Sequence, residues 1–371
     1  MTKINLNDIV PFETVHVGEF IKDELEARNM SQSELARLTG IQKPILNDII
    51  KGKRSLTPEM ALLLENVWEI SARIFMDYQT NYEIDCARIS QRVVSQKKNL
   101  EIWNVLKEHI NVSFFKKNGC VKGNVIEDVK NLFAIFKVES LDEFFAKEAE
   151  EHQLAVCYKK SDKVATSPVD LFSWKSYCLH LSEQMGDLEV PFDASKAEDL
   201  AEDLKNIFYE NRDTVERVRE SFNSRGVKFF IVPKEGQVPV DGMSFWKGNN
   251  PTVVLTMRFH SIDNFAFSVL HELGHVVRHL KEGGVCMVNM EGHDNTFEEI
   301  EANEFAMNAI IPASEWKHFM QQARGVSSYK IRPYIKAFSE KLQVNPQLVF
   351  GMYKHEINNY RIPNSFETKI N

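Results

Sequence analysis

The chain has 371 residues, of which 43% are hydrophobic, so it can bury a sizeable core and is long enough for two or three domains. Its formal net charge of −8 excludes a protein that coats nucleic acid non-specifically, but not a small DNA-reading domain with a local basic face. No signal-peptide run and no stretch of 18 apolar residues is present, and the five cysteines include no C-x-x-C pair, which predicts reduced thiols in a cytosolic protein without a membrane span.

The region from residue 14 to about 90 is predicted to form short helices separated by small turns. An amphipathic period that starts at Val17 predicts the first helix, which ends near Asn29. Ser31-Gln32-Ser33-Glu34 is a capping-box pattern that opens a second helix. The remaining signals are a stop at Gly40, a third helix from about Gln42 to Gly52, a fourth from Thr57-Pro58-Glu59 to about Val67, and a fifth from about Ser71.

The second and third of these helices form a helix-turn-helix pattern. Its internal core is predicted to contain Leu35, Ala36, Ile41, Leu46 and Ile49. This packing leaves polar residues exposed on the second helix of the pattern, and glutamine, asparagine and lysine can read base edges in a major groove. The predicted DNA-binding residues are Gln42, Lys43, Asn47 and Lys51 for base edges, with Gln32, Lys53 and Arg54 for phosphates. The alternative is a helical bundle used only for protein contacts.

The region 91–225 is predicted to be mostly helical and carries no catalytic motif. Phe172, Trp174 and Tyr177 are interpreted as core packing, not as an aromatic binding site. Strands are predicted at 226–233 and 252–257, with turns at Asp241-Gly242 and at 247–251. Helices then follow to about residue 360, and the tail from Ile362 is expected to be frayed.

The strongest chemical signal is His271-Glu272-Leu273-Gly274-His275. Residues four apart on a helix share a face, so His271 and His275 can bind one ion, and Glu272 can reach a water on it as a general base. Because H-E-x-x-H fixes only three positions, a chance helix with two core histidines is the alternative. Gly274 costs roughly 1 kcal/mol relative to alanine inside a helix, and close approach of another backbone would explain that cost.

Several downstream residues are candidates for the third metal ligand. Glu301 is the preferred candidate, because the small residues and Phe305 near it would let its helix pack tightly on the first. A straight helix carries His279 one turn past the ion. The metal is predicted to be Zn²⁺, with manganese and iron left open. The full set of candidates is His279, His293, Asp294, Glu298, Glu299, Glu301 and Glu304.

Residues 225–360 resemble the ImmA/IrrE metallopeptidase family. The resemblance is carried by the segment 271–275, by Asp263-Asn264-Phe265-Ala266-Phe267 before it, and by Glu301-Ala302-Asn303-Glu304-Phe305-Ala306 and Ile310-Ile311-Pro312 after it. It implies a zincin-like α+β domain with zinc on His271, His275 and Glu301, and Glu272 as the catalytic acid. Family members cut regulatory proteins such as repressors, often in response to stress or DNA damage. Val269-Leu270 departs from the commoner Leu-Ala.

Residues 16–84 resemble HigA-type antitoxins of plasmid-maintenance systems. The matching segments are His16-Val17-Gly18-Glu19-Phe20, Ser31-Gln32, Gly52-Lys53-Arg54, Thr57-Pro58-Glu59-Met60-Ala61 and Tyr78-Gln79-Thr80-Asn81-Tyr82. Proline usually stands in place of Val17. The resemblance implies a homodimer that binds operator DNA and neutralises a cognate toxin.

Together these patterns predict a mainly α protein with a small β-sheet, of the α+β class. The predicted parts are a helix-turn-helix domain at 1–90, a helical middle region at 91–225 and a metallopeptidase domain at 226–371. The first hypothesis is a DNA-binding regulator whose zinc endopeptidase cuts a repressor, a toxin or the chain itself. The second is an antitoxin or repressor whose vestigial peptidase domain only docks a partner. Glu272, kept between two ligands, favours the first.

Overall fold

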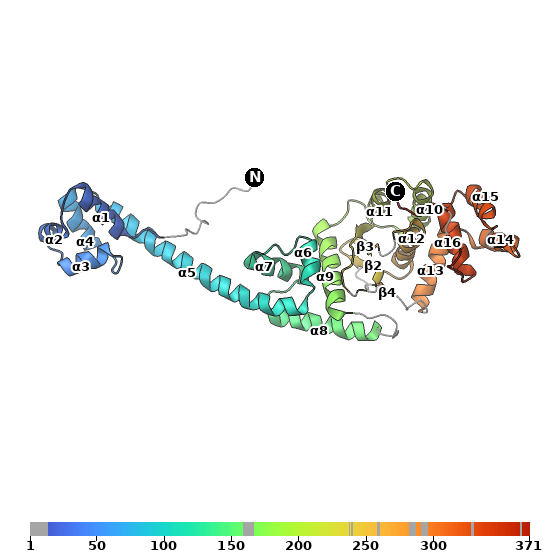
Figure 1. Cartoon of the computed structure of the whole chain (residues 1–371), viewed down its shortest axis with the longest axis horizontal. Coiled ribbons are helices and arrows are strands. Elements are labelled where there is room, and N and C mark those ends of the chain that lie inside the picture. The colour runs from blue at the N-terminus through green and yellow to red at the C-terminus, as the bar shows by residue number, and fades with distance from the viewer. Residues whose placement is uncertain are drawn as a thin grey trace. The chain divides into compact units, whose positions relative to one another are not determined.

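The computed structural model describes residues 14–158, 167–236, 238, 240–257, 260–281, 287–290, 296–327, 330–363 and 366–371. The chain forms two compact units, Met1–Trp103 and Asn104–Asn371 (Figure 1). The second unit holds a small sheet among many helices, so the predicted mainly α class with a small β-sheet is confirmed. The predicted division of the chain at residues 90 and 225 stays a prediction.

The first unit begins with four short helices whose ends follow the capping signals of the sequence. Ser31 Oγ accepts a hydrogen bond from the Glu34 backbone N–H at 3.2 Å, and Gly40 ends the second helix with φ of 73° in the left-handed region. Thr57 caps the fourth helix. The helices are α1 (Val17–Ala27), α2 (Gln32–Thr39), α3 (Lys43–Ile50) and α4 (Pro58–Trp68).

The core of this unit is the one that the helix-turn-helix pattern predicts. Leu35, Ile41, Leu46 and Ile49 are buried, and Ala36 is half-buried against them. These side chains hold α2 against α3, and α3 also packs against α1, while Lys43 and Pro44 at its start are exposed.

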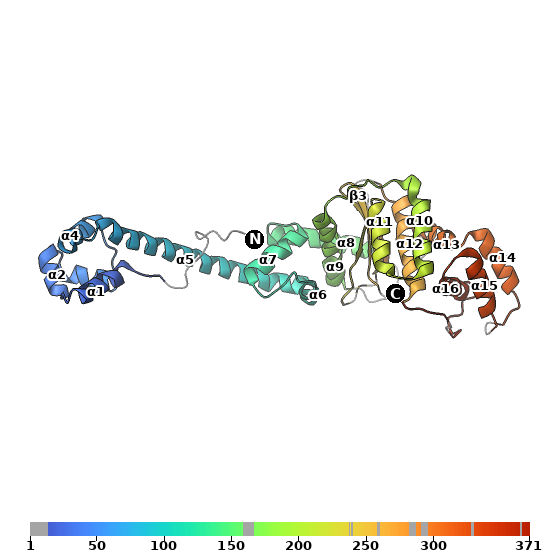
Figure 2. The same cartoon turned by 90° about the horizontal axis from the view of Figure 1, so that it is seen from above.

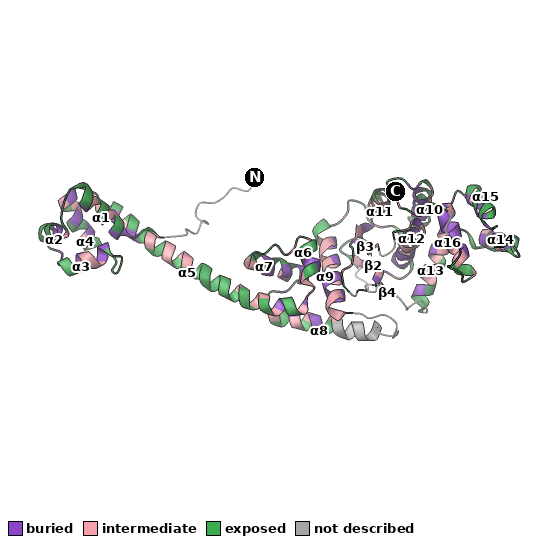
Figure 3. Cartoon of the chain, in the orientation of Figure 1, coloured by how far each residue is buried: buried purple, intermediate pink, exposed green. Residues whose placement is uncertain are grey.

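The fifth helix, α5 (Ala72–His109), is 38 residues long and continues past the end of the first unit. Phe75 and Gln79 near its start are buried against the short helices. Every residue from 90 to 98 is exposed, as Figure 3 shows for the middle of this helix. The predicted start near Ser71 is confirmed, while the length of α5 was not foreseen.

The second unit contains a helical part, a sheet and a second helical part. The predicted helical character of 91–225 is confirmed, because each regular element up to β1 is a helix in the described residues. Before the sheet come α6 (Val112–Lys117), α7 (Val125–Phe136), α8 (Leu141–Tyr158), α9 (Pro168–Met185), η2 (Ala194–Lys196), α10 (Ala197–Glu210) and α11 (Thr214–Ser224). Between the third and fourth strands comes α12 (Ile262–Arg278). After the fourth strand come α13 (Phe297–Ile310), α14 (Ala313–Ala323), α15 (Arg332–Leu342) and α16 (Pro346–Glu356).

The sheet has four strands in the order β1-β3-β2-β4. Strand β1 (Lys228–Ile231) runs parallel to β3 (Asn250–Leu255), whereas β2 (Val240–Lys247) is antiparallel to β3 and to β4 (Met287–Met290). The predicted turn at Asp241-Gly242 is wrong, because Gly242 lies in β2 opposite Leu255. The turn after Lys247 is confirmed, and β4 was not predicted.

Helices cover both faces of this sheet. Figure 2 shows α10, α11 and α12 side by side on one face, with α9 on the other. On the α9 side, the Trp174 indole donates to the Val232 carbonyl at 3.0 Å, and the buried Lys228 ammonium donates to the Ser182 carbonyl at 3.1 Å. Phe172 is also buried, so these aromatic side chains pack in the core as expected.

The end of the chain is held on the second unit, so the predicted frayed tail is wrong in its described part. Ile362 is 9% exposed. The Ile262 N–H donates to the Thr368 carbonyl at 2.8 Å, and the Thr214 N–H donates to the Asn371 carbonyl at 2.7 Å. The tail therefore joins the start of α12 to the start of α11.

Candidate metal centre

Helix α12 crosses the middle of the second unit and is enclosed on nearly all sides. Phe265, Val269, Leu270 and Leu273 pack into the main hydrophobic core. A helix that is buried around its circumference exposes almost no backbone or side chain to water, so its polar residues need partners inside the protein. The buried polar residues of its central turns are His271, Glu272 and His275.

Three side chains converge beside α12. The Nε2 atoms of His271 and His275 lie 3.0 Å apart, and the Glu299 carboxylate of α13 lies 3.2 Å from the first and 3.4 Å from the second. All three side chains are buried, and one ligand atom from each lies within 4.8 Å of the other two. Among the described residues this is the one such group of histidine, cysteine and acidic side chains.

The donor set fits a zinc ion. Catalytic zinc sites use three protein ligands, and two imidazoles with one carboxylate is a known combination. Donor atoms around a tetrahedral ion with bonds of about 2.1 Å lie ~3.4 Å apart, which is close to the separations found here. His271, His275 and Glu299 are therefore the residues that could hold the metal.

The electrostatics of Glu299 and His275 favour the forms that bind a metal, whereas the pKa of His271 moves the other way. Burial would raise the pKa of Glu299, but hydrogen bonds and charge from His271 and His275 outweigh it and lower the pKa to about 2. Burial lowers the pKa of His275, which keeps its imidazole neutral with a free lone pair. Burial also disfavours charge on His271, but its hydrogen bond to Glu299 raises its pKa.

Glu272 is fully buried beside this group. Neither of its carboxylate oxygens has a hydrogen-bond partner among the described residues. Burial raises the pKa of Glu272 to about 8, and the nearby His271 opposes that shift. Gly242 of β2 makes room for the carboxylate, because a Cβ atom there would lie 2.3 Å from Glu272 Oε1.

The structure does not bring the predicted third ligand, Glu301, to the two histidines. Glu301 Oε2 lies 3.0 Å from His279 Nε2, and Glu299 occupies the place next to the Nε2 atoms of His271 and His275. Positions i and i+2 of a helix are rotated by ~200° from each other, so Glu299 and Glu301 of α13 point to different sides. Glu298 is exposed, and the candidates His293 and Asp294 lie outside the described residues.

The predicted DNA-binding residues gather around α3. Gln42 precedes the helix and Lys43 begins it, and both are exposed, whereas Asn47 one turn later is half-buried. Lys51 ends the helix and is exposed. Of the predicted phosphate contacts, Lys53 and Arg54 are exposed after α3, and Gln32 in the first turn of α2 is half-buried.

Comparison with known families matches two separate parts of the chain. Residues 21–75 match the helix-turn-helix family. Residues 202–345 match the peptidase family described as the IrrE N-terminal-like domain, and this range includes the whole candidate metal centre. The chain combines a helix-turn-helix domain with an IrrE N-terminal-like domain. Both family resemblances predicted from the sequence are thereby confirmed.

Several solved structures are similar to part of the chain. The Pseudomonas aeruginosa antitoxin HigA with the higBA promoter is 30% identical, with 21% of this chain and 86% of that chain covered and a TM-score of 0.21. An addiction module antidote protein of a HigA family from Coxiella burnetii is 26% identical, with 23% and 95% covered and a TM-score of 0.22. No curated protein matches the chain.

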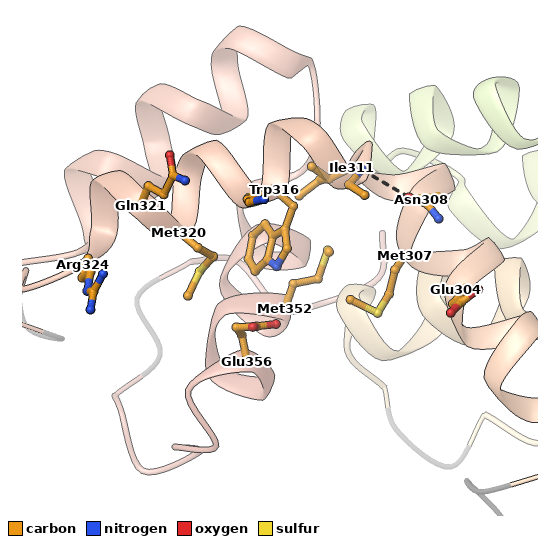
Figure 4. Close-up of a pocket in the computed structure, with 12 residues that line it drawn as sticks. Glu304, Met307, Asn308, Ile311, Trp316, Met320, Gln321, Arg324, Met352 and Glu356 are labelled. Atoms are coloured by element: carbon orange, nitrogen blue, oxygen red, sulfur yellow. Dashed lines mark hydrogen bonds between the residues drawn. The ribbon is translucent and has the colours of Figure 1, made fainter.

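The IrrE N-terminal-like domain borders a cavity whose lining does not include His271, His275 or Glu299. It has a volume of about 550 Å³ and is lined by α13, α14 and α16, with Met320, Trp316 and Met352 among its walls (Figure 4). Glu304, a further candidate ligand, lines this cavity and is exposed there.

Two functional positions of the IrrE N-terminal-like domain were missed. Asn303 Oδ1 lies 2.9 Å from His271 Nδ1, and Gly242 makes room for Glu272. Asn303 is four residues after Glu299, so the same helical spacing that pairs the histidines could have identified it. Asp241-Gly242 also fits the family resemblance, but its Asp-Gly pattern is locally typical of turns and was interpreted as one.

Close packing of α13 explains the glycine inside α12. A Cβ atom on Gly274 would lie 3.1 Å from the Ala302 Cα atom and 3.2 Å from the Phe305 Cβ atom. The predicted approach of another backbone at Gly274 is confirmed.

No helix in the described part of the chain is long and apolar enough to span a membrane.

Proposed function

We propose that this protein is a DNA-binding transcriptional regulator that carries a zinc-dependent endopeptidase. The substrate would be a regulatory protein: a repressor, a toxin or the chain itself. The observation that carries the enzymatic half is the buried group of His271, His275 and Glu299 with the partnerless carboxylate of Glu272 beside it. A cytosolic location belongs to the same proposal, and the described cysteines Cys86, Cys120 and Cys178 are not in disulfide bonds.

His271, His275 and Glu299 would hold the zinc ion. Bound zinc supplies Lewis acidity, which polarises a peptide carbonyl and lowers the pKa of water to about 7. The two imidazoles offer neutral nitrogen donors and Glu299 offers one negative charge. Since all three side chains are buried, they are held in fixed orientations and bulk water is kept from the site.

Glu272 would move the protons of the reaction. Its carboxylate takes a proton from the attacking water as the peptide carbonyl is attacked, and then delivers it to the leaving amine. Neither oxygen is held in a short hydrogen bond within the described part of the chain, and the neighbouring Ser244 hydroxyl only partly offsets the effect of burial. Burial raises the pKa of this carboxyl group, which strengthens it as a base once it is ionised.

The helix-turn-helix domain would bind an operator with α3 as the recognition helix. Gln42, Lys43 and Asn47 lie at its beginning and on one face, where major-groove recognition helices contact base edges. Lys51 at its other end would add a further base contact, and Gln32, Lys53 and Arg54 would contact phosphates. Such domains bind paired half-sites as dimers, so a homodimer is part of the proposal.

The metal content of the purified chain tests the enzymatic half. We expect about one zinc per wild-type chain and little in His271→Ala, because that variant removes one of three ligands. The exposed His260, replaced by alanine, is a matched control and should retain the metal. Elemental analysis after incubation with zinc and gel filtration provides the measurement.

Failure of the wild-type chain to bind zinc would favour the second function. The chain would then be an operator-binding antitoxin or repressor, with a vestigial peptidase domain that docks a toxin. The intact Glu272 argues against that reading, because a docking surface needs no buried base between two ligands.

The double variant Lys43→Ala with Asn47→Ala is expected to lose operator binding. Each good base contact contributes about 1–3 kcal/mol of discrimination, so two lost contacts should weaken binding by at least ~30-fold. The DNA is first selected from random duplexes with the wild-type chain and then used in mobility-shift titrations. Lys22→Ala, an exposed lysine on α1, should bind normally, and an unchanged shift with the double variant would remove α3 as the recognition helix.

A further inference from the structure

A line of hydrogen-bonding groups runs outward from one of the proposed metal ligands. His275 Nδ1 lies 3.0 Å from His279 Nδ1, and His279 Nε2 lies 3.0 Å from Glu301 Oε2. The side chains of His279 and Glu301 are 10% and 30% exposed, so this line leads from the buried centre towards the surface. It connects the end of α12 with α13.

The direction of these hydrogen bonds is set by the groups at the two ends of the line, His275 and Glu301. An imidazole whose Nε2 lone pair binds a metal carries its hydrogen on Nδ1, so His275 donates from Nδ1. His279 must then accept at Nδ1 and carry its own hydrogen on Nε2. The Glu301 carboxylate, which is an acceptor when ionised, receives that hydrogen. Every donor in the line therefore meets one acceptor.

The backbone holds His279 where this line needs it. His279 ends α12, and its own N–H donates to the His275 carbonyl at 2.9 Å. The N–H of Leu280 donates to the same carbonyl at 3.0 Å. His279 is therefore tied to His275 through main chain as well as side chain, although it is too far along the helix to reach the metal position.

The other histidine ligand has a different outer partner. His271 Nδ1 lies 2.9 Å from Asn303 Oδ1, a neutral acceptor on α13. His275 instead has a second imidazole backed by a carboxylate. Outer partners of this kind orient the ring and raise the basicity of the ligand, and a carboxylate does so more strongly than an amide.

We propose that His279 and Glu301 are positioning residues that fix the ring of His275 for metal binding. This inference rests on the proposed zinc site, with Glu299 as its third ligand. Glu301 is then an outer carboxylate and not a ligand. Loss of an outer partner typically weakens metal binding by about 10–100-fold, a smaller effect than loss of a ligand.

The test measures the zinc dissociation constant of the full chain by competition with a chromogenic chelator. His279→Phe keeps a ring and removes both nitrogens, and we expect zinc binding about 10–100-fold weaker. His279→Asn keeps an acceptor at the position of Nδ1 but loses the hydrogen bond to Glu301, and we expect it to bind zinc more tightly than His279→Phe but no more tightly than Glu301→Ala. Glu301→Ala should weaken binding by about tenfold, whereas Glu304→Ala on the same helix should leave it unchanged.

Thermal unfolding of the zinc-stripped variants separates positioning from folding. If His279→Phe and His279→Asn unfold at similar temperatures but differ in zinc affinity, the difference belongs to the hydrogen bond and not to packing. Zinc binding by His279→Phe within twofold of wild type would overturn the proposal. A wild-type chain that binds no zinc would instead overturn the metal centre itself, so the two failures are distinguishable.

Discussion

Glu272→Gln is expected to abolish peptide cleavage while the chain still binds zinc. Glutamine has nearly the shape of glutamate and fits the space left by Gly242, so the buried pocket should be preserved. It cannot accept a proton from water, and general-base catalysis contributes about 10²–10⁴-fold to the rate. Zinc content and cleavage rate, measured on the same preparations, give both halves of the result.

The cleavage assay uses the zinc-loaded wild-type chain to find a substrate first. Candidate regulatory proteins, including the chain itself, are incubated with it, and the products are identified by mass spectrometry. Glu298→Gln, which alters an exposed carboxylate near the centre, should cut at the wild-type rate. Cleavage by Glu272→Gln at the wild-type rate would remove Glu272 from its role as base.

Glu299→Ala is expected to lose zinc, while Glu298→Ala beside it keeps the metal. Glu299 contacts the Nε2 atoms of both histidines at 3.2 and 3.4 Å, so alanine removes one of three ligands. The expected loss of affinity exceeds the ~100-fold upper range for an outer partner. Titration with a competing chelator measures the dissociation constants of both variants.

The same titration compares Glu299 with Glu301. If Glu301→Ala weakens zinc binding more than Glu299→Ala does, Glu301 is the third ligand, as the sequence predicted. Tight zinc binding by Glu299→Ala would show that the carboxylate beside the histidines is not a ligand. Circular dichroism of each variant confirms that the fold is retained.

The pair of histidines and their helix could be predicted, because the information is local. The spacing of His271 and His275 fixes their common face once the segment is a helix, and apolar neighbours indicate that the helix is buried. The same is true of the capped helices of the first unit, where Ser31 and Gly40 mark the ends of α2. These signals depend on a few consecutive residues.

The choice of the third candidate ligand was harder, because it depends on which face of α13 is turned towards α12. The buried residues of α13 include Ala302, Ala306 and Ile310, each four residues from the next, and Glu299 lies on that side. That spacing was available in the sequence and would have favoured Glu299 over Glu301. The acidic run 298–304 offered several carboxylates, and composition alone did not separate them.

The sheet was only partly predictable, since strand pairing is a long-range property. Strands β1 and β3 have continuous apolar runs that identify them. Strand β2 contains Asp241-Gly242, which locally is typical of a turn. Here Gly242 serves the packing of Glu272 instead, and this contact joins residues distant in the sequence. Strand β4 is short, and its pairing with β2 is what defines it as a strand.

The exposed middle of α5 has a practical consequence for biochemistry. Residues 90–98 are all exposed and include Arg92, Lys97 and Lys98. A helical turn without tertiary packing opens at little free-energy cost, which makes it a preferred site for limited proteolysis. Mild trypsin treatment should therefore cut here before it cuts within the packed helices, and the fragments would allow operator binding and zinc binding to be studied on separate pieces of one protein.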